Sequence, residues 1–356
     1  MNRRSLAAGL VLGALCASLA PAQEAFSGVR RIVAVGDVHG GFDEFVAVLR
    51  AAGVIDASNN WSGGATHLVQ TGDLLDRGAS SRKVIELIMA LEGQAKKAKG
   101  RVHALLGNHE AMNMYGDLRY VSAGEYESYQ GSDSVQLRDQ AYDAMADPAK
   151  KADRAYQAKW YQEHPLGWVE HRQAFAPNGR YGKFVRERPV IVKINDAIFL
   201  HGGISRKYVT MDMAAINRKA RAELKDFNLL EGGMLMDDQG PLWYRGLASD
   251  PEGGLSSLVD EVLKAFGVAR IVIGHTPTAG AVLPRFGGRV VLIDVGLSKG
   301  YHDSPACLLI EDGKAWAIHR GTRLALPESS DISRYLADAA QLDPPGTKLR
   351  KAAGQP

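Results

Sequence analysis

Short apolar runs alternate with longer amphipathic stretches along the chain from about residue 28 onward. The runs 30–36, 66–72 and 101–107 are rich in Val, Ile and Leu and end in glycine, which is typical of buried strands. The stretches 42–54 and 81–99 repeat their apolar residues with helical spacing and predict amphipathic helices. This alternation of strand and helix predicts an α/β protein.

The second half of the chain continues the pattern after a region of different composition. Residues 115–185 are polar, helix-favouring and rich in Tyr, so we expect a helical insert or cap rather than an independent domain. The polar residues 326–356 predict a mobile tail. Further strands are predicted at 189–194, 197–203, 269–275 and 288–296, with a hairpin formed by 306–313 and 314–321.

The first 22 residues have the features of a secretory signal peptide. They combine a basic start, an apolar stretch of about 15 residues and a small-residue end, Ala20-Pro21-Ala22. We therefore expect residues 1–22 to be removed and the mature chain to be exported, either to a periplasm or out of the cell. A membrane anchor is disfavoured because a bilayer span needs about 20 apolar residues. No later stretch supplies one, so no stable membrane insertion is expected after signal removal.

Composition and charge indicate the size of the domain and exclude some kinds of partner and site. With 46% hydrophobic and 23% charged residues, the 356-residue chain is long enough for one large globular domain. The net charge of +3 falls to +1 without Arg3 and Arg4, so charge gives no reason to expect a nucleic-acid partner. Cys16 leaves with the signal, and Cys307 then stands alone in an apolar run, where we expect a buried thiol. An internal disulfide and a cysteine zinc site are excluded.

Polar motifs follow five of the apolar runs, and glycine stands beside each of them. In α/β sheets ligands gather where the carboxyl ends of strands meet loops, so we expect these motifs to form one site. Each motif alone could be turn chemistry or a structural histidine, but five at the same kind of position are not accidental. The motif residues are Asp37 and His39; Asp73, Asp76 and Arg77; Asn108, His109 and Glu110; His201; and His275.

These motifs resemble the signature of a known enzyme family. In chain order, "GDVHG", "GDLLDRG", "GNHE", "HGG" and the later His275 resemble the phosphoprotein phosphatase branch of the calcineurin-like metallophosphoesterases. The strings "MNMYGDLRYV", "LWYRG" and "FGGRVVLIDVGLSK" are similar to the Shewanella-like protein phosphatases. The resemblance implies a four-layer α/β/β/α sandwich over residues 28–325, with the helical insert at 115–185 and a dinuclear metal site at the strand ends.

The family pattern implies two divalent or trivalent metal ions. Oxygen and nitrogen donors without a thiolate suit Mn, Fe or Zn. By the resemblance, Asp37, His39 and Asp73 hold one metal. Asp73 then bridges to the second metal, which is completed by Asn108, His201 and His275.

The resemblance also implies direct attack on phosphorus by a hydroxide that bridges the two metals, with no covalent phosphoenzyme. His109 stands beside Asn108 and is expected to protonate the leaving group as a general acid. Asp76 is expected to orient His109 and to stabilise its charge. Arg77 offers a planar fork to two phosphate oxygens, and Arg245 in "LWYRG" is the candidate for a second phosphate-binding arginine.

Together these residues predict a metal-dependent hydrolase of phosphomonoesters, most readily a protein phosphatase. A phosphotyrosine preference is open, because the Shewanella-like branch includes such members. The alternative is an exported small-molecule phosphatase or a dinucleoside polyphosphate hydrolase, which share the metal motifs. The insert favours a protein substrate, because its Tyr and Trp residues could form a wall for an aromatic phosphate. A metal-stabilised protein without activity is disfavoured, because His109, Arg77 and every ligand position are kept.

Overall fold

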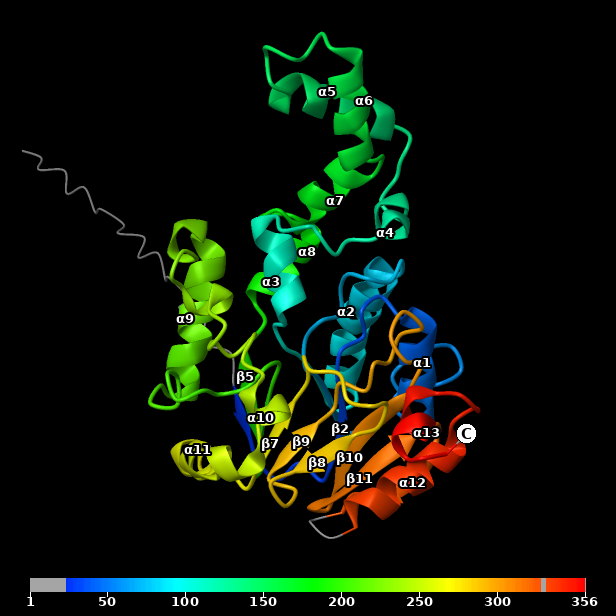
Figure 1. Cartoon of the computed structure of the whole chain (residues 1–356), viewed down its shortest axis with the longest axis vertical. Helices are drawn as coiled ribbons and strands as arrows, with labels where there is room; N and C mark the ends of the chain where they lie inside the picture. The colour runs from blue at the N-terminus through cyan, green and yellow to red at the C-terminus, as the bar shows by residue number, and fades with distance from the viewer. Residues whose placement is uncertain (1–23, 328–330, 356) are drawn as a thin grey trace, which may run out of the picture.

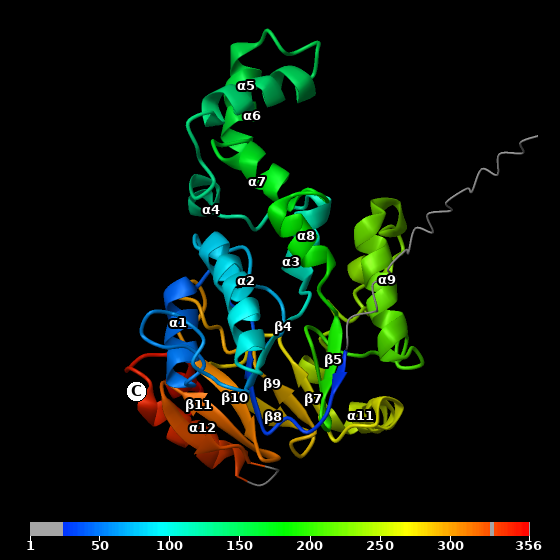
Figure 2. The same ribbon diagram turned by 180° about the vertical axis from the view of Figure 1, so that it is seen from behind.

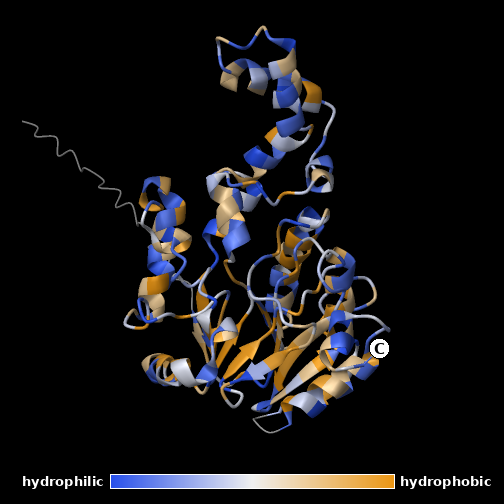
Figure 3. Ribbon diagram, in the orientation of Figure 1, coloured by the Kyte–Doolittle hydropathy of each residue, from blue (hydrophilic) through white to orange (hydrophobic). Residues whose placement is uncertain are grey.

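Two six-stranded sheets form the centre of the molecule, and helices flank them (Figure 1). The computed structural model describes residues 24–327 and 331–355, so the predicted signal segment 1–22 lies outside the described residues. The predicted α/β class, with two sheets between helices, is confirmed. Figure 3 shows that the sheets carry the most apolar part of the chain.

The first sheet joins the N-terminal strands to the C-terminal hairpin. β2, β3 and β4 are parallel, and β10 pairs antiparallel with β2. The predicted hairpin is confirmed, because β10 and β11 pair antiparallel from Ala306↔His319 to Glu311↔Lys314. The strands, in sheet order, are β12 (Thr322–Ala325), β11 (Lys314–His319), β10 (Ala306–Glu311), β2 (Arg31–Val35), β3 (His67–Gln70) and β4 (Arg101–Ala104).

The second sheet is built around three parallel strands, β6, β7 and β9. Their carboxyl ends lie at the same edge, as do those of β2, β3 and β4 in the first sheet. In sheet order the strands are β1 (Ala25–Phe26), β5 (Ile191–Ile194), β6 (Ala197–Leu200), β7 (Arg270–Ile273), β9 (Val290–Leu292) and β8 (Leu283–Arg285).

One continuous core packs the two sheets and their helices together. In α2 (Ser81–Lys97) the buried residues Val84, Ile85, Ile88 and Leu91 recur with helical spacing, which explains why this stretch is a helix packed on one face. Cys307 is buried in β10 as expected, and burial raises the pKa of its thiol to about 12. The other helices of the body are α1 (Phe42–Ala51), α3 (Asn108–Tyr115), α9 (Met213–Lys225), α10 (Gly246–Ser249) and α11 (Glu252–Phe266), with 3₁₀ turns η1 (Phe227–Leu229) and η2 (Met234–Met236).

The insert is helical, as its composition predicts, and it projects away from the sheets (Figures 1 and 2). Its outer part has a small core of its own, formed by Tyr142, Ala146 and Trp160. Among residues 24–327 and 331–355, no helix has the length and apolar character needed to cross a bilayer. The helices of the insert are α4 (Ala123–Glu127), α5 (Ser134–Met145), α6 (Arg154–Glu163), α7 (Trp168–Phe175) and α8 (Arg180–Arg186).

The C-terminal segment differs from the mobile tail that its polarity predicted. It forms α12 (Ile332–Leu342) and α13 (Lys348–Ala352), and Tyr335 and Leu349 are buried. The Tyr335 hydroxyl donates a hydrogen bond to the carbonyl of Val282 at 2.8 Å. The prediction was wrong because the apolar residues of α12 are few but share one face, so overall composition understates what the helix buries.

Glu125 fastens the base of the insert to the body. Its Oε2 accepts a hydrogen bond from the backbone N–H of Ser81 at 2.9 Å, at the start of α2. Nearby, the Ser122 hydroxyl donates to the carbonyl of Gly78 at 3.0 Å. Glu125 is 1% exposed, and burial raises the pKa of its carboxyl to about 7.

This shifted carboxyl predicts a pH-dependent stability. Because the folded pKa of Glu125 lies above its ordinary value, the folded protein holds a proton that the unfolded chain releases, and stability falls as pH rises from about 5 to 8. Glu125→Gln cannot titrate, so its free energy of unfolding relative to the parent should rise by about 2 kcal/mol over this range. Urea unfolding at pH 5 and pH 8, with the same metal loading, measures the difference. Glu127 is exposed on the same helix, so Glu127→Gln is the control and its stability should change with pH as that of the parent does. If the stability of Glu125→Gln changes with pH by the same amount as that of the parent, the assignment is contradicted.

Candidate metal centre

The six predicted metal ligands lie together at the carboxyl ends of the strands. Asp37 and His39 follow β2, Asp73 follows β3, and Asn108 begins α3 just after β4. His201 follows β6, and His275 follows β7. All six side chains are buried. The two sheets therefore bring residues that are up to 238 positions apart into direct contact, as in the hydrogen bond from the backbone N–H of His275 to Asp37 Oδ1 at 2.9 Å.

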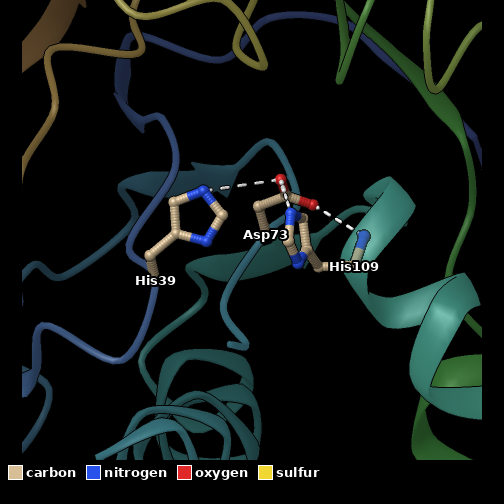
Figure 4. A group of neighbouring side chains, drawn as sticks. All are labelled: His39, Asp73 and His109. Carbon is tan, nitrogen blue, oxygen red and sulfur yellow. Dashed lines mark hydrogen bonds and ion pairs between the residues drawn. The ribbon is translucent and has the colours of Figure 1, made fainter. Parts of the chain in front are cut away.

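Asp73 lies at the centre of this group. Its Oδ1 accepts a hydrogen bond from the backbone N–H of His109 at 3.0 Å. Its Oδ2 faces Nε2 of His39 at 3.7 Å and Nε2 of His109 at 3.8 Å (Figure 4). Nε2 of His201 lies nearer to Oδ2, at 3.3 Å. Burial disfavours the ionised carboxylate, but the surrounding imidazoles outweigh it and hold the pKa of Asp73 well below its ordinary value.

Backbone carbonyls fix which nitrogen two of these histidines present. His39 Nδ1 lies 3.0 Å from the carbonyl of Leu75, and His201 Nδ1 lies 3.0 Å from the carbonyl of Thr71. Each Nδ1–H donates to its carbonyl, so a neutral ring turns the Nε2 lone pair toward the site. Burial lowers the pKa of His39 to about 3, which keeps the ring in the neutral form that a metal requires.

In a second group of candidate ligands, acceptor atoms face one another without a hydrogen between them. His201 Nε2 lies 2.9 Å from Asn108 Oδ1 and 3.3 Å from Asp73 Oδ2, so three acceptor atoms converge. His275 Nε2 is buried without a hydrogen-bond partner, and burial lowers the pKa of this ring to about 2. Converging lone pairs in a buried site are stable when a cation lies among them.

The arrangement therefore fits metal ions. Asp73, His39 and His109 form one set whose ligand atoms all lie within 4.8 Å of one another, and Asp73, His201 and His275 form a second. Asp73 belongs to both sets, as the bridging role requires. Asp37 extends the first set, since His39 Nε2 lies 3.9 Å from Asp37 Oδ2. The site is compatible with two metal ions that share Asp73.

Asp294 is a residue of the site that the sequence analysis missed. It follows β9 and lines a small pocket together with the candidate ligands His39, Asp73, Asn108 and His275. Its carboxyl lies close enough to that of Asp37 to shift the pKa of Asp37. Burial raises the pKa of Asp294 to about 6, and burial together with Asp294 and Asp73 raises the pKa of Asp37. A signal was present, because "VVLIDVG" repeats the pattern of an apolar strand followed by Asp and Gly.

Close backbone contacts hold the loops in place. A side chain at Gly107 would meet Asp73 Oδ1 at 2.3 Å, and one at Gly274 would meet Asp37 Oδ1 at 2.4 Å, so glycine is required at both positions. Glu110, for which the sequence suggested no role, accepts hydrogen bonds from the backbone N–H groups of Asp73, Leu74 and Gly107 at 2.8 Å each. Glu110 thus fastens the loop after β3 to the start of α3.

His109 and Asp76 form a buried pair beside the ligands. His109 Nδ1 lies 2.6 Å from Asp76 Oδ2, and Asp76 Oδ1 also accepts a hydrogen bond from Asn113 Nδ2 at 2.9 Å. Burial lowers the pKa of His109, but the charge of Asp73 and the hydrogen bond to Asp76 outweigh it, and the net pKa is raised. His109 can therefore keep a proton on Nε2, the atom that faces Asp73.

Two arginines line the small pocket that His39, Asp73 and His109 also line, and the volume of this pocket is about 90 Å³. Arg77 comes from the loop after β3, and Arg245 precedes α10. Arg245 Nη1 donates hydrogen bonds to the carbonyl of His275 at 2.6 Å and to Thr276 Oγ1 at 3.1 Å. Both predicted phosphate-binding residues thus lie beside the candidate ligands.

The aromatic wall differs from the one that the insert's composition suggested. Trp160 and Tyr142 pack on each other at 5.3 Å in the outer part of the insert. The aromatic residues that line the pocket are Tyr120, Trp243 and Tyr301, of which only Tyr120 lies within 115–185. Composition identified a Tyr-rich segment, but it could not show whether these rings pack inside the insert or line the site.

A larger cavity, of about 620 Å³, lies at the opposite end of the strands. Phe26, Arg31 and His67 line it, and Arg31 and His67 begin β2 and β3. None of the motif residues lines this cavity. The chemistry of the donors, and not cavity size, therefore locates the candidate site.

The fold and the donor set define a metal-dependent hydrolase, and family comparison agrees. Residues 30–279 match the model of the calcineurin-like phosphoesterase family. The chain belongs to this family and is a metal-dependent phosphoester hydrolase.

Individual relatives show which members of the family this chain resembles. An uncharacterized protein of Schizosaccharomyces pombe is 33% identical over 82% of this chain and 81% of its own length. Shewanella-like protein phosphatase 2 of Arabidopsis thaliana is 28% identical over 79% of this chain and 75% of its own length. The crystal structure of a cold-active protein-tyrosine phosphatase of a psychrophilic Shewanella sp. has a TM-score of 0.65 at 30% identity, covering 85% of this chain and 82% of that one. The resemblance expected from the motifs is confirmed.

The shared position of Asp73 predicts the effect of removing its charge. Asp73→Asn should bind fewer metal ions per chain than the parent and should lose on the order of 10³-fold in activity, because both donor sets depend on this carboxylate. Metal analysis after dialysis and the rise in melting temperature on adding Mn²⁺ measure the loss. Asp312→Asn, an exposed Asp in the first sheet's hairpin turn, should behave like the parent. Unchanged metal content in Asp73→Asn would refute the shared role.

Proposed function

We infer that this chain is a dinuclear-metal protein phosphatase that prefers phosphotyrosine. The observation that carries the proposal is that His109, held by Asp76, and the arginines Arg77 and Arg245 line one pocket, which four of the candidate metal ligands also line. This combination serves a phosphate ester in particular, because it offers cations for the oxygens and a proton for the leaving group. The ligands alone would suit many hydrolases.

Each residue has a distinct task in this reaction. Bound metal ions would supply an activated water and neutralise phosphate charge. Arg77 and Arg245 would hold the nonreacting phosphate oxygens through their N–H groups. His109 would donate the proton on Nε2 to the departing oxygen, while Asp76 accepts the Nδ1–H and so keeps the ring oriented and charged.

Two observations support a protein substrate with an aromatic phosphate. Shewanella-like protein phosphatases and a Shewanella protein-tyrosine phosphatase are among the relatives, and the latter shares 30% identity and the fold. Tyr120, Trp243 and Tyr301 line the pocket, and aromatic rings of this kind pack well against a phenyl phosphate.

The metal and the cellular location belong to the same proposal. His, Asp and Asn donors without a thiolate favour Mn, Fe or Zn. The sequence of residues 1–22 has the layout of a secretory signal, which supports export and a periplasmic location. Fractionation of cells that express the full chain, with N-terminal sequencing of the product, tests this part directly.

Activity of the metal-loaded mature chain on a matched panel tests the substrate class. The panel contains phosphotyrosine, phosphoserine and phosphothreonine versions of one peptide together with a dinucleoside tetraphosphate. We expect the highest kcat/KM on the phosphotyrosine peptide. A preference of about 100-fold or more for the nucleotide would assign the chain to small-molecule phosphate hydrolysis instead.

Removal of the acid predicts a dependence on the leaving group. His109→Ala should lose about 10²-fold or more in kcat on a phosphoserine peptide, whose alkoxide needs a proton, and much less on p-nitrophenyl phosphate. Steady-state kinetics on both substrates, with metal content determined for each preparation, measure the ratio. His164→Ala, which lies in the insert away from the pocket, is the matched control. Equal losses on the two substrates would remove the general-acid role.

A further inference from the structure

The Arg77 guanidinium lies between two tyrosine rings. Arg77 Cζ is 4.6 Å from the centre of the Tyr120 ring and 5.2 Å from the centre of the Tyr301 ring. All three residues line the candidate pocket. Within residues 24–327 and 331–355, no carboxylate forms an ion pair with Arg77, although Asp73 and Asp76 stand close to it in the same loop.

The two rings are themselves held by residues of the site. The Tyr301 ring stacks on His39 with centroids 5.2 Å apart and planes inclined by 17°. The Tyr120 ring lies 5.1 Å from His109, and the Tyr120 carbonyl accepts a hydrogen bond from the backbone N–H of Arg77 at 2.9 Å. The stack therefore runs from a candidate metal ligand, through the arginine, to the candidate acid, and its members come from separate segments of the chain.

A neighbouring arginine shows the contrasting arrangement. Arg119 directly precedes Tyr120, but its Nε donates to Asp117 Oδ1 at 2.8 Å, and its Nη2 also bonds that carboxylate. Those donors are occupied, and the charge of Arg119 is offset. A ring face attracts a guanidinium without taking its N–H groups, which lie in the plane at the edge of the fork. The Arg77 side chain, by contrast, donates no hydrogen bond to residues 24–327 or 331–355, so its N–H groups are available to a ligand.

We propose that Tyr120 and Tyr301 are positioning residues that hold Arg77 ready for phosphate. Because the rings fix the guanidinium beforehand, a phosphate would displace no carboxylate and would order no free arginine on binding. This role rests on the proposed function, since it assigns the rings to phosphate binding at the same pocket. It also explains why Arg77, which is exposed beside the buried acids Asp73 and Asp76, pairs with no carboxylate of residues 24–327 and 331–355.

Binding of inorganic phosphate to the metal-loaded protein tests the proposal. Inorganic phosphate has no leaving group, so a direct contact between a tyrosine and an aromatic substrate cannot contribute. Tyr120→Leu and Tyr301→Leu should each weaken phosphate binding by about 5- to 10-fold in calorimetry. Tyr120→Phe and Tyr301→Phe retain the ring and should recover most of this loss.

The coupling to Arg77 separates positioning from general damage. In an Arg77→Ala background, adding either Leu substitution should weaken phosphate binding by less than about twofold, because the group that the rings hold is gone. The same loss in both backgrounds, or no loss in the single variants, would overturn the proposal. If Tyr301→Leu loses metal through His39, the Tyr120→Leu cycle decides alone, because the ring that Tyr120 contacts, His109, is not one of the six predicted ligands.

A matched tyrosine–arginine pair provides the control. In the insert, Arg138 Cζ lies 4.2 Å from the centre of the Tyr161 ring, and neither residue lines the pocket. Tyr161→Leu should leave phosphate affinity unchanged; an equal loss there would also count against the proposal. Calorimetry needs no turnover, so it separates this proposal from the proposed function. If the chain binds phosphate with the expected coupling but hydrolyses no phosphoester, the proposed function is overturned and the positioning role of the two tyrosines stands. Full phosphatase activity without the coupling would do the reverse.

Discussion

The buried carboxylate of Asp73 is the constraint on which the site depends. An ionised carboxylate removed from water is stable only when donors and positive charge surround it. The structure supplies a backbone N–H from His109 and three imidazole rings around Oδ2, but it also buries Asp37 and Asp294 close by. The pKa values of Asp37 and Asp294 are raised, so the groups of the protein alone do not offset this concentration of carboxyls. Bound metal ions would supply the missing positive charge, and the positions of the strands, loops and glycines bring these groups within reach of one another.

Such a site also requires unfavourable backbone conformations, which the fold must offset. His39, Asp73, Asp76, Arg77 and His275 all have φ between 46° and 68°, in the left-handed region that residues with a side chain seldom adopt. Each costs on the order of 1 kcal/mol and persists only where the surroundings fix it. The fixing contacts are specific: Glu110 binds three backbone N–H groups around Asp73, and the Asp73 carbonyl accepts the N–H groups of Val38 and His39 at 2.9 and 3.0 Å. The strained residues therefore lie at the site itself, and the stability of the surrounding core offsets their conformational free energy.

Sequence reasoning succeeded where a local pattern determines position and failed where packing does. Each predicted ligand follows an apolar strand, so the rule that strand ends meet at one edge was enough to group Asp37, Asp73 and His275. Asp294 obeys the same rule and was missed only because its motif was interpreted as strand alone. Tyr301 could not be identified in this way: it lies in an irregular loop, and only the fold brings it onto His39 and Arg77. The aromatic insert and the polar tail show the same limit, because composition does not reveal which face a side chain occupies.

The insert is part of the site's support, although most of it lies far from the chemistry. Residues 120–125 contact the loop 76–81 at three points: the Tyr120 carbonyl accepts the N–H of Arg77, Ser122 donates to Gly78, and Glu125 accepts the N–H of Ser81. That loop carries both Asp76 and Arg77 in left-handed conformations, and Ser81 Oγ in turn accepts the N–H of Asp76 at 3.1 Å. Without residues 120–125, two backbone N–H groups and one carbonyl of the loop would lose their partners. The base of the insert therefore orients the acid pair and the phosphate arginine together, while the outer helices pack around a separate core of Tyr142, Ala146 and Trp160.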